Sequence, residues 1–435
     1  MGLKLRPYQD DAADFLYARD RAMILAPVGA GKTAITLTAM QAMLNDGHVK
    51  RWLVVAPKRV CTDVWPVEAP KWSGITPALA VGNPAQRAAA IQSDARVVII
   101  NYDNLDKLDD LSGFDGIVFD ELTRLKNPAG KRFKALEKLL APVRVRWGLT
   151  GSFTSNGLED VFGQCKIVEQ ALLGRAKGAF LQQYFHCINR DFGQWTPAPG
   201  ALEQVMARIR PATFVLEPGE YSDKLPPCHV VEVRCQFDDS KPYEKMKKDY
   251  VVRFGGDTTV IAQNAAAVTT KLQQMSSGFV YDRENGGSVW FSSHKFDRLE
   301  ELLAENQRAN TIIFYTFQEE LAELRRRYPD LQTLDDDNAI ERWNCGKIPL
   351  LAAHPKSAQY GLNLQFGGNM MVFLSLPWSL VDFEQAIGRI HRSGQTRDVW
   401  VYLMITEKTI DDRILAALRE KRKVSDLAMD ELHDR

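Results

Sequence analysis

The chain has 435 residues, of which 45% are hydrophobic and 25% charged, and its formal net charge is zero. Because one hydrophobic core rarely serves so long a chain, we expect two domains of about 150–250 residues each. The composition is that of a soluble globular protein, and no apolar run approaches the roughly 20 residues that cross a bilayer, so no membrane partner is expected. With zero net charge, any nucleic-acid binding must depend on a local basic groove.

Targeting and metal-binding signals are also missing from the sequence. The N-terminus, MGLKLRPYQD, has no apolar core of a secretory signal, and Arg6 stands where myristoylation requires Ser or Thr. None of the six cysteines forms a C-x-x-C pair, so neither a zinc site nor a disulfide framework is predicted. We therefore expect a protein of the reducing cytoplasm.

An apolar run leads into a loop of small residues in the stretch MILAPVGAGKTAIT, residues 23–36. The stretch matches the Walker pattern G-x-x-x-x-G-K-[ST], apart from an alanine at the first position. Glycines let backbone N–H groups turn inward around phosphate oxygens, the lysine reaches the β- and γ-phosphates, and the threonine hydroxyl ligates Mg²⁺. The stretch therefore predicts a phosphate site formed by Val28, Gly29, Ala30, Gly31, Lys32 and Thr33.

Apolar runs that alternate with helical segments continue along the first half of the chain. They are predicted to be strands at 21–26, 51–56, 96–101, 116–120 and 145–150. Such alternation indicates a parallel sheet with helices on both faces and a ligand at the carboxyl ends of the strands. One run, FDGIVFDE, ends in Asp120 and Glu121. Beside a Walker loop, the first acid would hold Mg²⁺ and the second would activate the attacking water as general base.

The alternation stops and later resumes, and this predicts the domain organisation. Segment 157–215 reads as a helical part of a first lobe that spans 1–220, and EPGEYSDKLPP reads as a linker. The second lobe, 221–435, is predicted to be largely helical over 240–308. Its expected strands lie at 311–315, 350–353, 371–375 and 399–405, and a C-terminal helix follows from Thr409.

Polar residues form a stripe near the end of the second lobe, in FEQAIGRIHRSGQTRDVWVY, residues 383–402. If a helix runs to Gly394, then Gln385, Arg389 and Arg392 share one of its faces. Such a face contacts either solvent, which is the default, or a polyanion. Because a Walker site needs cations that neutralise the developing charge, we predict that both arginines act as arginine fingers.

QAIGRIHRSGQ resembles motif VI of superfamily-two helicases, in the form used by Swi/Snf-type ATPases. Other segments resemble the motifs of that family in the family's order. They are LRPYQ (5–9, Q motif), LVVAPKRVCTDVWPVEAPKW (53–72, Ia), VVIINYDNL (97–105, Ib), DELTRLKNPAGKRFKAL (120–136, II), WGLTGSFTSN (147–156, III), TIIFYTFQEEL (311–321, IV) and HPKSAQYGLNLQ (354–365, V). The Asp-Glu-Leu-Thr and His-Pro-x-Ser segments are similar to those of small bacteriophage-encoded members.

The resemblance implies an α/β protein with two RecA-like P-loop lobes, each a mainly parallel sheet with helices on both faces, and small helical insertions. It implies that segment 157–215 forms a helical protrusion of the first lobe. It implies ATP and Mg²⁺ as ligands. The implied nucleotide contacts beyond the Walker loop are Arg6, Gln9, Gly361 and Gln385. The implied catalytic residues are Lys32, Glu121, Arg389 and Arg392, and the metal ligands are Thr33 and Asp120.

DNA is the partner that the resemblance implies, bound without sequence preference through loops at the strand ends. The candidate contacts are Lys58, Arg59, Asn101, Tyr102, Thr316, Lys356 and Ser357. Taken singly, each is more often a solvated loop residue than a contact. Duplex DNA is favoured, and we expect a monomer.

The resulting prediction is an ATP-dependent translocase on mostly double-stranded DNA. Two alternatives stay open: a strand-separating or annealing helicase in phage replication or recombination, and a nucleotide-dependent clamp that delivers a partner nuclease. No long β-hairpin wedge is recognisable, which favours tracking over unwinding. The chain departs from the family at Leu122-Thr123, where Ala-His is frequent, and at Ser152-Phe153, where Thr-Pro is usual. A third departure is Ser357-Ala-Gln in place of Ala-Gly-Gly.

Overall fold

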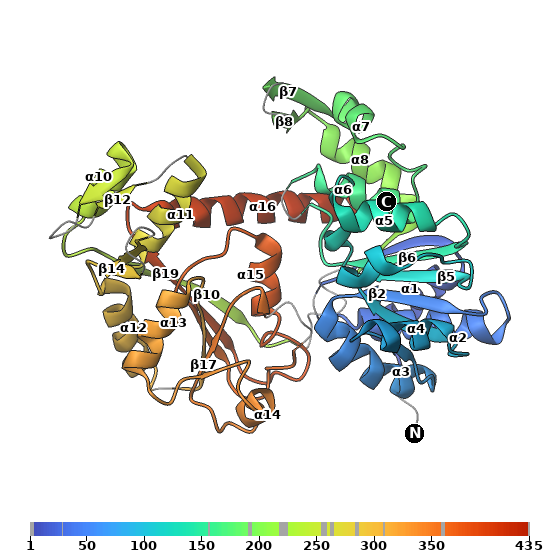
Figure 1. The fold of residues 1–435 in the computed structure, drawn as a ribbon, viewed down its shortest axis with the longest axis horizontal. Coiled ribbons are helices and arrows are strands. Elements are labelled where there is room, and N and C mark those ends of the chain that lie inside the picture. Colours follow the sequence, from blue (N-terminus) through green and yellow to red (C-terminus); the bar gives the residue numbers. More distant parts are fainter. Residues whose placement is uncertain are drawn as a thin grey trace. The chain divides into compact units, whose positions relative to one another are not determined.

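The computed structural model describes residues 4–27, 29–154, 157–189, 194–216, 225–253, 259–261, 265–282, 287–307, 309–357 and 362–433. The chain divides into two compact units, shown with their elements in Figure 1. Unit 1 comprises Met1–Asp223 and Lys421–Arg435, and unit 2 comprises Lys224–Glu420. The sequence-based boundary at 220/221 differs in one respect, because it assigns the C-terminal residues to the second lobe.

Unit 1 contains a seven-stranded sheet in the order β3-β4-β2-β5-β6-β1-β9, in which every pairing is parallel. Its strands are β1 (Arg21–Leu25), β2 (Trp52–Ala56), β3 (Ala78–Ala80), β4 (Val97–Asn101), β5 (Gly116–Asp120), β6 (Val145–Thr150) and β9 (Thr213–Val215). All five predicted strands are confirmed. The short strands β3 and β9 were not among the predicted strands.

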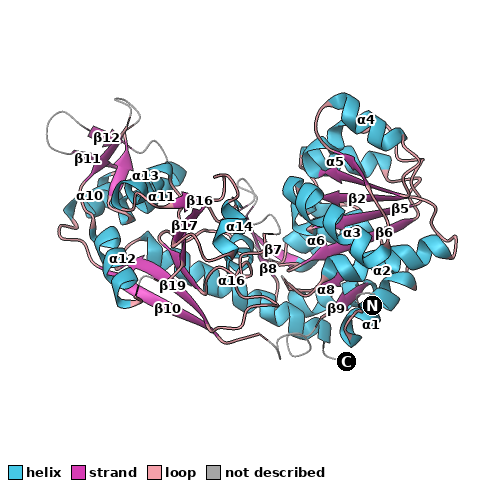
Figure 2. Cartoon of the chain, turned by 90° about the horizontal axis from the view of Figure 1, so that it is seen from below, coloured by secondary structure: helices cyan, strands magenta, loops and turns pink. Residues whose placement is uncertain are grey.

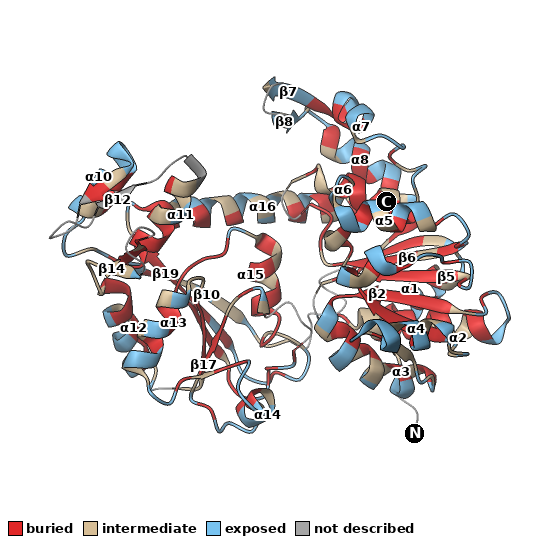
Figure 3. Ribbon diagram, in the orientation of Figure 1, coloured by how far each residue is buried: buried red, intermediate tan, exposed pale blue. Residues whose placement is uncertain are grey.

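Helices cover both faces of this sheet, as predicted. They are α1 (Pro7–Tyr17), α2 (Lys32–Asn45), α3 (Trp65–Ser73), α4 (Pro84–Gln92), α5 (Lys131–Leu139) and α6 (Asp160–Val168). Because side chains alternate along a strand, β5 sends Ile117 and Phe119 into one hydrophobic core and Val118 into the other. Figure 3 shows that the central strands are buried, whereas the helices also carry exposed residues. This double coverage explains why the strands read as continuous apolar runs.

The protrusion of unit 1 is not wholly helical, and in this respect the prediction for 157–215 is wrong. Besides α7 (Lys177–Tyr184) and α8 (Ala201–Ile209), it contains an antiparallel hairpin of β7 (Phe185–Asn189) and β8 (Gln194–Pro197). Figure 2 draws both strands. The aromatic and branched residues of Phe-His-Cys-Ile favour a strand over a helix, and this local preference prevails here.

Unit 2 contains a six-stranded parallel sheet in the order β10-β19-β18-β15-β17-β16. Its strands are β10 (Cys228–Cys235), β15 (Thr311–Phe314), β16 (Gln332–Thr333), β17 (Leu350–Ala353), β18 (Met370–Phe373) and β19 (Val399–Thr406). Its helices are α10 (Lys241–Asp249), α11 (Ala265–Ser276), α12 (His294–Glu305), α13 (Gln318–Arg327), α14 (Ala339–Asn344) and α15 (Leu380–Ile387). The predicted strands at 311–315, 350–353, 371–375 and 399–405 are confirmed.

Two small hairpins interrupt the region 240–308, which the sequence predicts to be largely helical. They are β11 (Val251–Arg253) with β12 (Thr259–Ile261), and β13 (Phe279–Tyr281) with β14 (Ser288–Trp290). The last element, α16 (Ile410–His433), starts in unit 2, and its residues from Lys421 belong to unit 1. Among the described helices, none combines the length and the apolar character that crossing a membrane requires.

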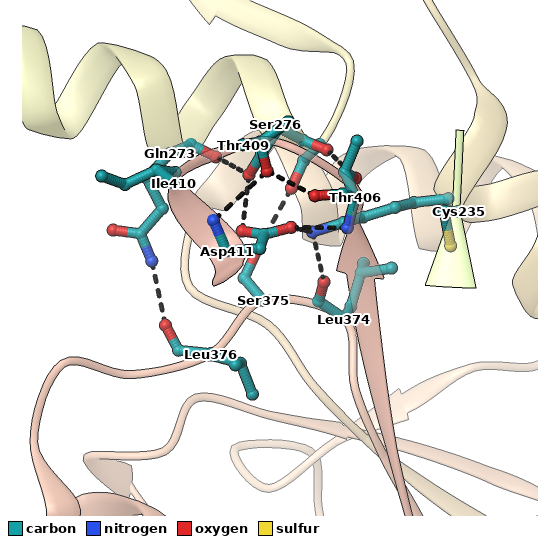
Figure 4. Close-up of polar contacts among 12 residues, drawn as sticks. Cys235, Gln273, Ser276, Leu374, Ser375, Leu376, Thr406, Thr409, Ile410 and Asp411 are labelled. Carbon is teal, nitrogen blue, oxygen red and sulfur yellow. Dashed lines mark hydrogen bonds and ion pairs between the residues drawn. The ribbon is translucent and has the colours of Figure 1, made fainter. Parts of the chain in front are cut away.

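A buried ion pair fastens the strand ends of unit 2. Lys295 Nζ lies 2.7 Å from Asp411 Oδ2, and both side chains are at most 1% exposed. Lys295 also donates to the Leu374 carbonyl at the end of β18, while Asp411 accepts from Ser276 Oγ and from the Thr406 N–H. Figure 4 shows Asp411 beside Ser276 and Thr406. Because the pair is hydrogen-bonded on both sides, it holds the carboxyl ends of β18 and β19 in register.

Candidate nucleotide-binding and catalytic site

The Walker loop connects β1 to α2, and its backbone is shaped for an anion. Gly29 and Gly31 have φ values of +88° and +85°, which residues with a Cβ rarely adopt. At Gly31 a Cβ would also overlap the side-chain amide of Gln9. The first N–H groups of α2 point out of the helix start and carry its positive dipole end. The predicted contact Val28 lies outside the described residues.

Lys32, the first residue of α2, folds back over the loop. Its Nζ donates to the carbonyls of Ala26 (2.6 Å) and Pro27 (2.9 Å). Thr33 follows as a partly exposed side chain at the same helix start. The ammonium group and the hydroxyl therefore occupy one end of α2, as the Walker pattern predicts.

The predicted nucleotide contacts before β1 also lie against this loop. Gln9 sits in the first turn of α1, where its Oε1 accepts from the Arg6 N–H at 3.0 Å. Its Nε2 donates to the Ala30 carbonyl at 3.1 Å. The hydrogen bond from Gln9 to Ala30 thus holds the start of α1, with Arg6, next to the phosphate loop, although Gln9 and Ala30 are 21 residues apart in the sequence.

Asp120 ends β5 at the same edge of the sheet, because β6 pairs in parallel with both β5 and β1. Its Oδ2 accepts from the indole N–H of Trp65 at 2.9 Å. Burial raises the pKa of Asp120 to about 6, although the Trp65 hydrogen bond and the charge of Lys32 act in the opposite direction. The structure therefore brings Lys32 and the first acid of the pair together.

Glu121 occupies a strained turn immediately after β5. Its φ of +69° and ψ of +65° lie in the left-handed region, which costs a non-glycine residue about 1–3 kcal/mol. The hydroxyl of Thr123 donates to Glu121 Oε1 at 2.6 Å. The hydroxyl of Tyr102 donates to the carbonyls of Asp120 (2.9 Å) and Glu121 (3.4 Å). The backbone of this turn is therefore stabilised by Tyr102, which lies in another element, and the Glu121 side chain by its neighbour Thr123.

Thr33 and Asp120 are oxygen ligands of the type that Mg²⁺ prefers. Together with the glycine-rich loop, they fit a nucleoside triphosphate with its metal ion at the carboxyl edge of the unit 1 sheet. Within the residues that the structure describes, no group of three or more His, Cys, Asp and Glu side chains could hold a metal ion by itself. Thr33 and Asp120 would thus help to hold the Mg²⁺ that accompanies the phosphates.

Two candidate DNA contacts of unit 1 lie in the interior. Asn101 at the end of β4 and Tyr102 after it are 4% and 2% exposed, so neither side chain presents the surface that direct DNA contact requires. Tyr102 instead holds the turn of the two acids, and burial raises its pKa well above the usual value. Lys58 is exposed and Arg59 partly exposed, after the end of β2.

The remaining DNA candidates lie at the carboxyl end of the unit 2 sheet. Thr316 follows β15, and its N–H donates to the buried carboxylate of Glu320 at 2.8 Å. Lys356 is exposed and Ser357 partly exposed after β17, which pairs with β15. The backbone N–H groups of Lys356 and Ser357 donate to His354. Gly361 lies outside the described residues.

The segment that resembles motif VI differs from the prediction of one long helix. α15 ends at Ile387, so Arg389 and Arg392 lie in turns and do not continue a face with Gln385. Contacts with distant segments draw the chain away from the helix: His391 Nε2 donates to the Pro226 carbonyl at 2.8 Å. Gln385 and Arg389 are buried, and Arg392 donates to the Leu362 carbonyl at 3.3 Å.

The groups that support the two acids, namely Trp65, Thr123 and the hydroxyl of Tyr102, were not predicted from the sequence to act on them. Trp65 and Tyr102 act on Asp120 and Glu121 from other elements of the sheet, so no local pattern marks them. Thr123 was visible only as a departure from the family motif. That departure was the one signal which could have pointed to its contact with Glu121.

Comparison with known proteins matches residues 8–276 to the SNF2-related domain and residues 294–394 to the helicase conserved C-terminal domain. The chain is 35% identical to putative protein p41 of Acyrthosiphon pisum secondary endosymbiont phage 1, with 98% of both chains covered. It is 24% identical to the DNA repair and recombination protein RAD54-like of Gallus gallus, over 99% of this chain and 68% of that protein. Among solved structures, the SWI2/SNF2 ATPase core of Sulfolobus solfataricus in complex with dsDNA aligns with 99% of this chain and 94% of that one. Its sequence identity is 20% and its TM-score 0.48.

Proposed function

The chain belongs to the SNF2-related family of helicase-like ATPases, and from this premise we propose that it hydrolyses ATP in order to move along mainly double-stranded DNA. Family membership implies ATP as substrate, usually with Mg²⁺. The observation that carries the proposal is the meeting of Lys32, Asp120 and Glu121 at one edge of the unit 1 sheet, beside the glycine-shaped loop.

The residues of unit 1 divide the work of hydrolysis. The N–H groups of the loop and of the start of α2 bind the phosphates, and Lys32 exchanges its two carbonyl partners for phosphate oxygens. Thr33 and Asp120 would hold Mg²⁺, which would supply positive charge next to the phosphates. Glu121 accepts the proton of the attacking water. Arg6 and Gln9 contact the base end of the nucleotide.

Unit 2 supplies the remaining groups in this proposal. Arg389 and Arg392 stabilise charge on the transferred phosphoryl group, and Gln385 and Gly361 complete the nucleotide contacts. Lys58, Arg59, Thr316, Lys356 and Ser357 contact the DNA backbone without reading sequence, so binding weakens with salt. Kinship with a protein of DNA repair and recombination supports DNA as the partner. We place the activity, by a monomer, in the cytoplasm of a phage-infected bacterium.

Steady-state ATP hydrolysis by wild type and Glu121→Gln, without nucleic acid and with duplex, single-stranded or forked DNA, tests the function. We expect duplex to stimulate wild type at least tenfold and the variant to hydrolyse at least a hundredfold more slowly, since it lacks the general base. Displacement of a third strand from a triplex would then demonstrate movement. Hydrolysis that no DNA stimulates would rule out a DNA-driven motor for this chain.

Strand separation is the second candidate, because unit 1 carries the hairpin β7–β8. Ile188 on β7 is 68% exposed, which suits an apolar wedge at a DNA fork. Unwinding of forked DNA, together with stimulation by forks greater than by duplex, would favour this candidate. Slow hydrolysis with persistent DNA retention would instead favour a nucleotide-dependent clamp that delivers a nuclease or recombination partner.

A further inference from the structure

Glu121, the proposed general base, has an unfavourable backbone conformation. Glu121 has left-handed backbone angles, which a residue with a long side chain adopts only when its surroundings impose them. A glutamate side chain also has three rotatable bonds, so its carboxylate can point in several directions. Catalysis requires one direction, toward the water that attacks the γ-phosphate. Something in the structure must therefore orient the carboxylate as well as the backbone.

Two contacts fix the backbone of this turn. The buried hydroxyl of Tyr102 bonds the carbonyls of Asp120 and Glu121. Leu122 is fully buried and packs on Gly148 of β6, where a Cβ on the glycine would overlap the leucine side chain. These contacts hold the peptide units and the following residue, and leave the direction of the Glu121 carboxylate to be set by contacts of its own side chain.

Thr123 makes such a contact. Its Oγ1 donates to Glu121 Oε1 at 2.6 Å, a short charge-assisted hydrogen bond in a partly buried setting. Thr123 is the second residue of the 3₁₀ turn Leu122–Leu125, and β-branching restricts its χ1 angle. The donor is therefore rigidly placed, two residues from the carboxylate that it holds.

We propose that Thr123 is a positioning residue that orients the Glu121 carboxylate for proton abstraction from the attacking water. The inference rests on the proposed function, ATP hydrolysis at this site. In that step the water oxygen forms a bond to the γ-phosphorus and the bond to the β-phosphate oxygen breaks. ADP takes the bonding electron pair, and the proton of the water passes to Glu121. Thr123 acts on this step through Glu121 and needs no contact with ATP.

The test compares Thr123→Val, which keeps the shape and removes the hydroxyl, with Thr123→Ser, which restores it. The full chain is assayed with Mg²⁺, ATP and saturating duplex DNA. We expect Thr123→Val to lower kcat about tenfold to a hundredfold, the worth of a hydrogen bond to a charged group, and to leave the KM for ATP within about twofold. Thr123→Ser should recover most of kcat. Thr38→Val removes a hydroxyl that bonds a helix carbonyl elsewhere in unit 1, and should match wild type.

A double substitution separates positioning from a structural role. If Thr123 acts through Glu121, Thr123→Val added to Glu121→Gln should reduce hydrolysis no further than Glu121→Gln alone. Additive losses, or a wild-type kcat in Thr123→Val, would overturn the inference. If Thr123→Val does not fold, Thr123→Ala replaces it under the same criteria. Wild-type hydrolysis that Glu121→Gln slows at least a hundredfold without abolishing it supports ATP hydrolysis at this site independently of Thr123, whereas a wild type without hydrolysis overturns both.

Discussion

At the scale of single residues, the site depends on two positions with left-handed backbone angles, Gly31 and Glu121. Gly31 combines a positive φ with the side chain of Gln9 directly beside it, and Glu121 adopts similar backbone angles with a long side chain. The first position follows from the Walker pattern. At the second position, Tyr102 and Leu122 hold the backbone and Thr123 holds the carboxylate, and no spacing in the sequence predicts these contacts.

Gly31→Ala should weaken nucleotide binding, because the added Cβ displaces the Gln9 amide, a proposed nucleotide contact, and disfavours the positive φ of the phosphate loop. We expect the affinity for a fluorescent ATP analogue to fall more than tenfold, measured by anisotropy. Gly47→Ala is the matched control. Gly47 also has a positive φ, of +72°, but its Cβ position has no neighbour within 4 Å. That variant should lose about 1 kcal/mol of stability and keep its affinity. Equal affinities in the two variants would contradict the packing argument.

At the scale of elements, long-range contacts decided where the helix α15 ends. α15 ends at Ile387 although the residues that follow suit a helix, because His391 and Arg392 bond to Pro226 and Leu362. Long-range contacts also join the ends of β18, β19 and α11, through the polar cluster around Asp411 (Figure 4). The ends of these elements therefore depend on hydrogen bonds between distant segments more than on local propensity.

Lys295→Met should destabilise unit 2 strongly, because Asp411 would remain buried without its cation. Removing one partner of a buried ion pair costs about 3–5 kcal/mol. Urea unfolding followed by fluorescence and circular dichroism would measure the loss. Lys247→Met is the control, since Lys247 is exposed and lies 4.0 Å from Glu244. Its cost should stay below about 1 kcal/mol. A similar, small cost in both variants would show that the buried pair contributes little.

At the scale of the whole molecule, the chain forms two α/β units, and its last residues rejoin the first. Ser425 of α16 hydrogen-bonds Ser152 at 3.0 Å, in the segment after β6 that departs from the family motif. Ala428 and Leu432 enter the same hydrophobic core as Phe119 and Phe162. Unit 1 therefore needs residues from both ends of the chain to complete its core.

Leu432→Ala should destabilise unit 1 by about 2–4 kcal/mol, because it leaves a cavity in that core. Leu427→Ala is the control within the same helix, where the side chain is 44% exposed and should contribute less than about 1 kcal/mol. Thermal unfolding with nucleotide as a reporter of unit 1 would measure both. Equal losses would contradict the assignment of the C-terminal residues to the core of unit 1.

The sequence by itself determined the parallel sheets, the Walker loop, the acid pair and the family, because each depends on a short pattern of neighbouring residues. Apolar runs mark buried strands, and the glycine-lysine-threonine spacing is dictated by phosphate geometry. The DNA contacts, the arginine fingers and the domain boundary that the sequence suggests stay predictions. Asn101 and Tyr102 are the exception, because their side chains are buried and cannot contact DNA directly.

Only the tertiary structure decided how the acids are held and which element completes the first core. Trp65 reaches Asp120 from 55 residues away, and Ser425 reaches Ser152 from 273 residues away. No local pattern records such contacts, because they arise when parallel strands bring their carboxyl ends to one edge and a distant helix covers exposed apolar surface.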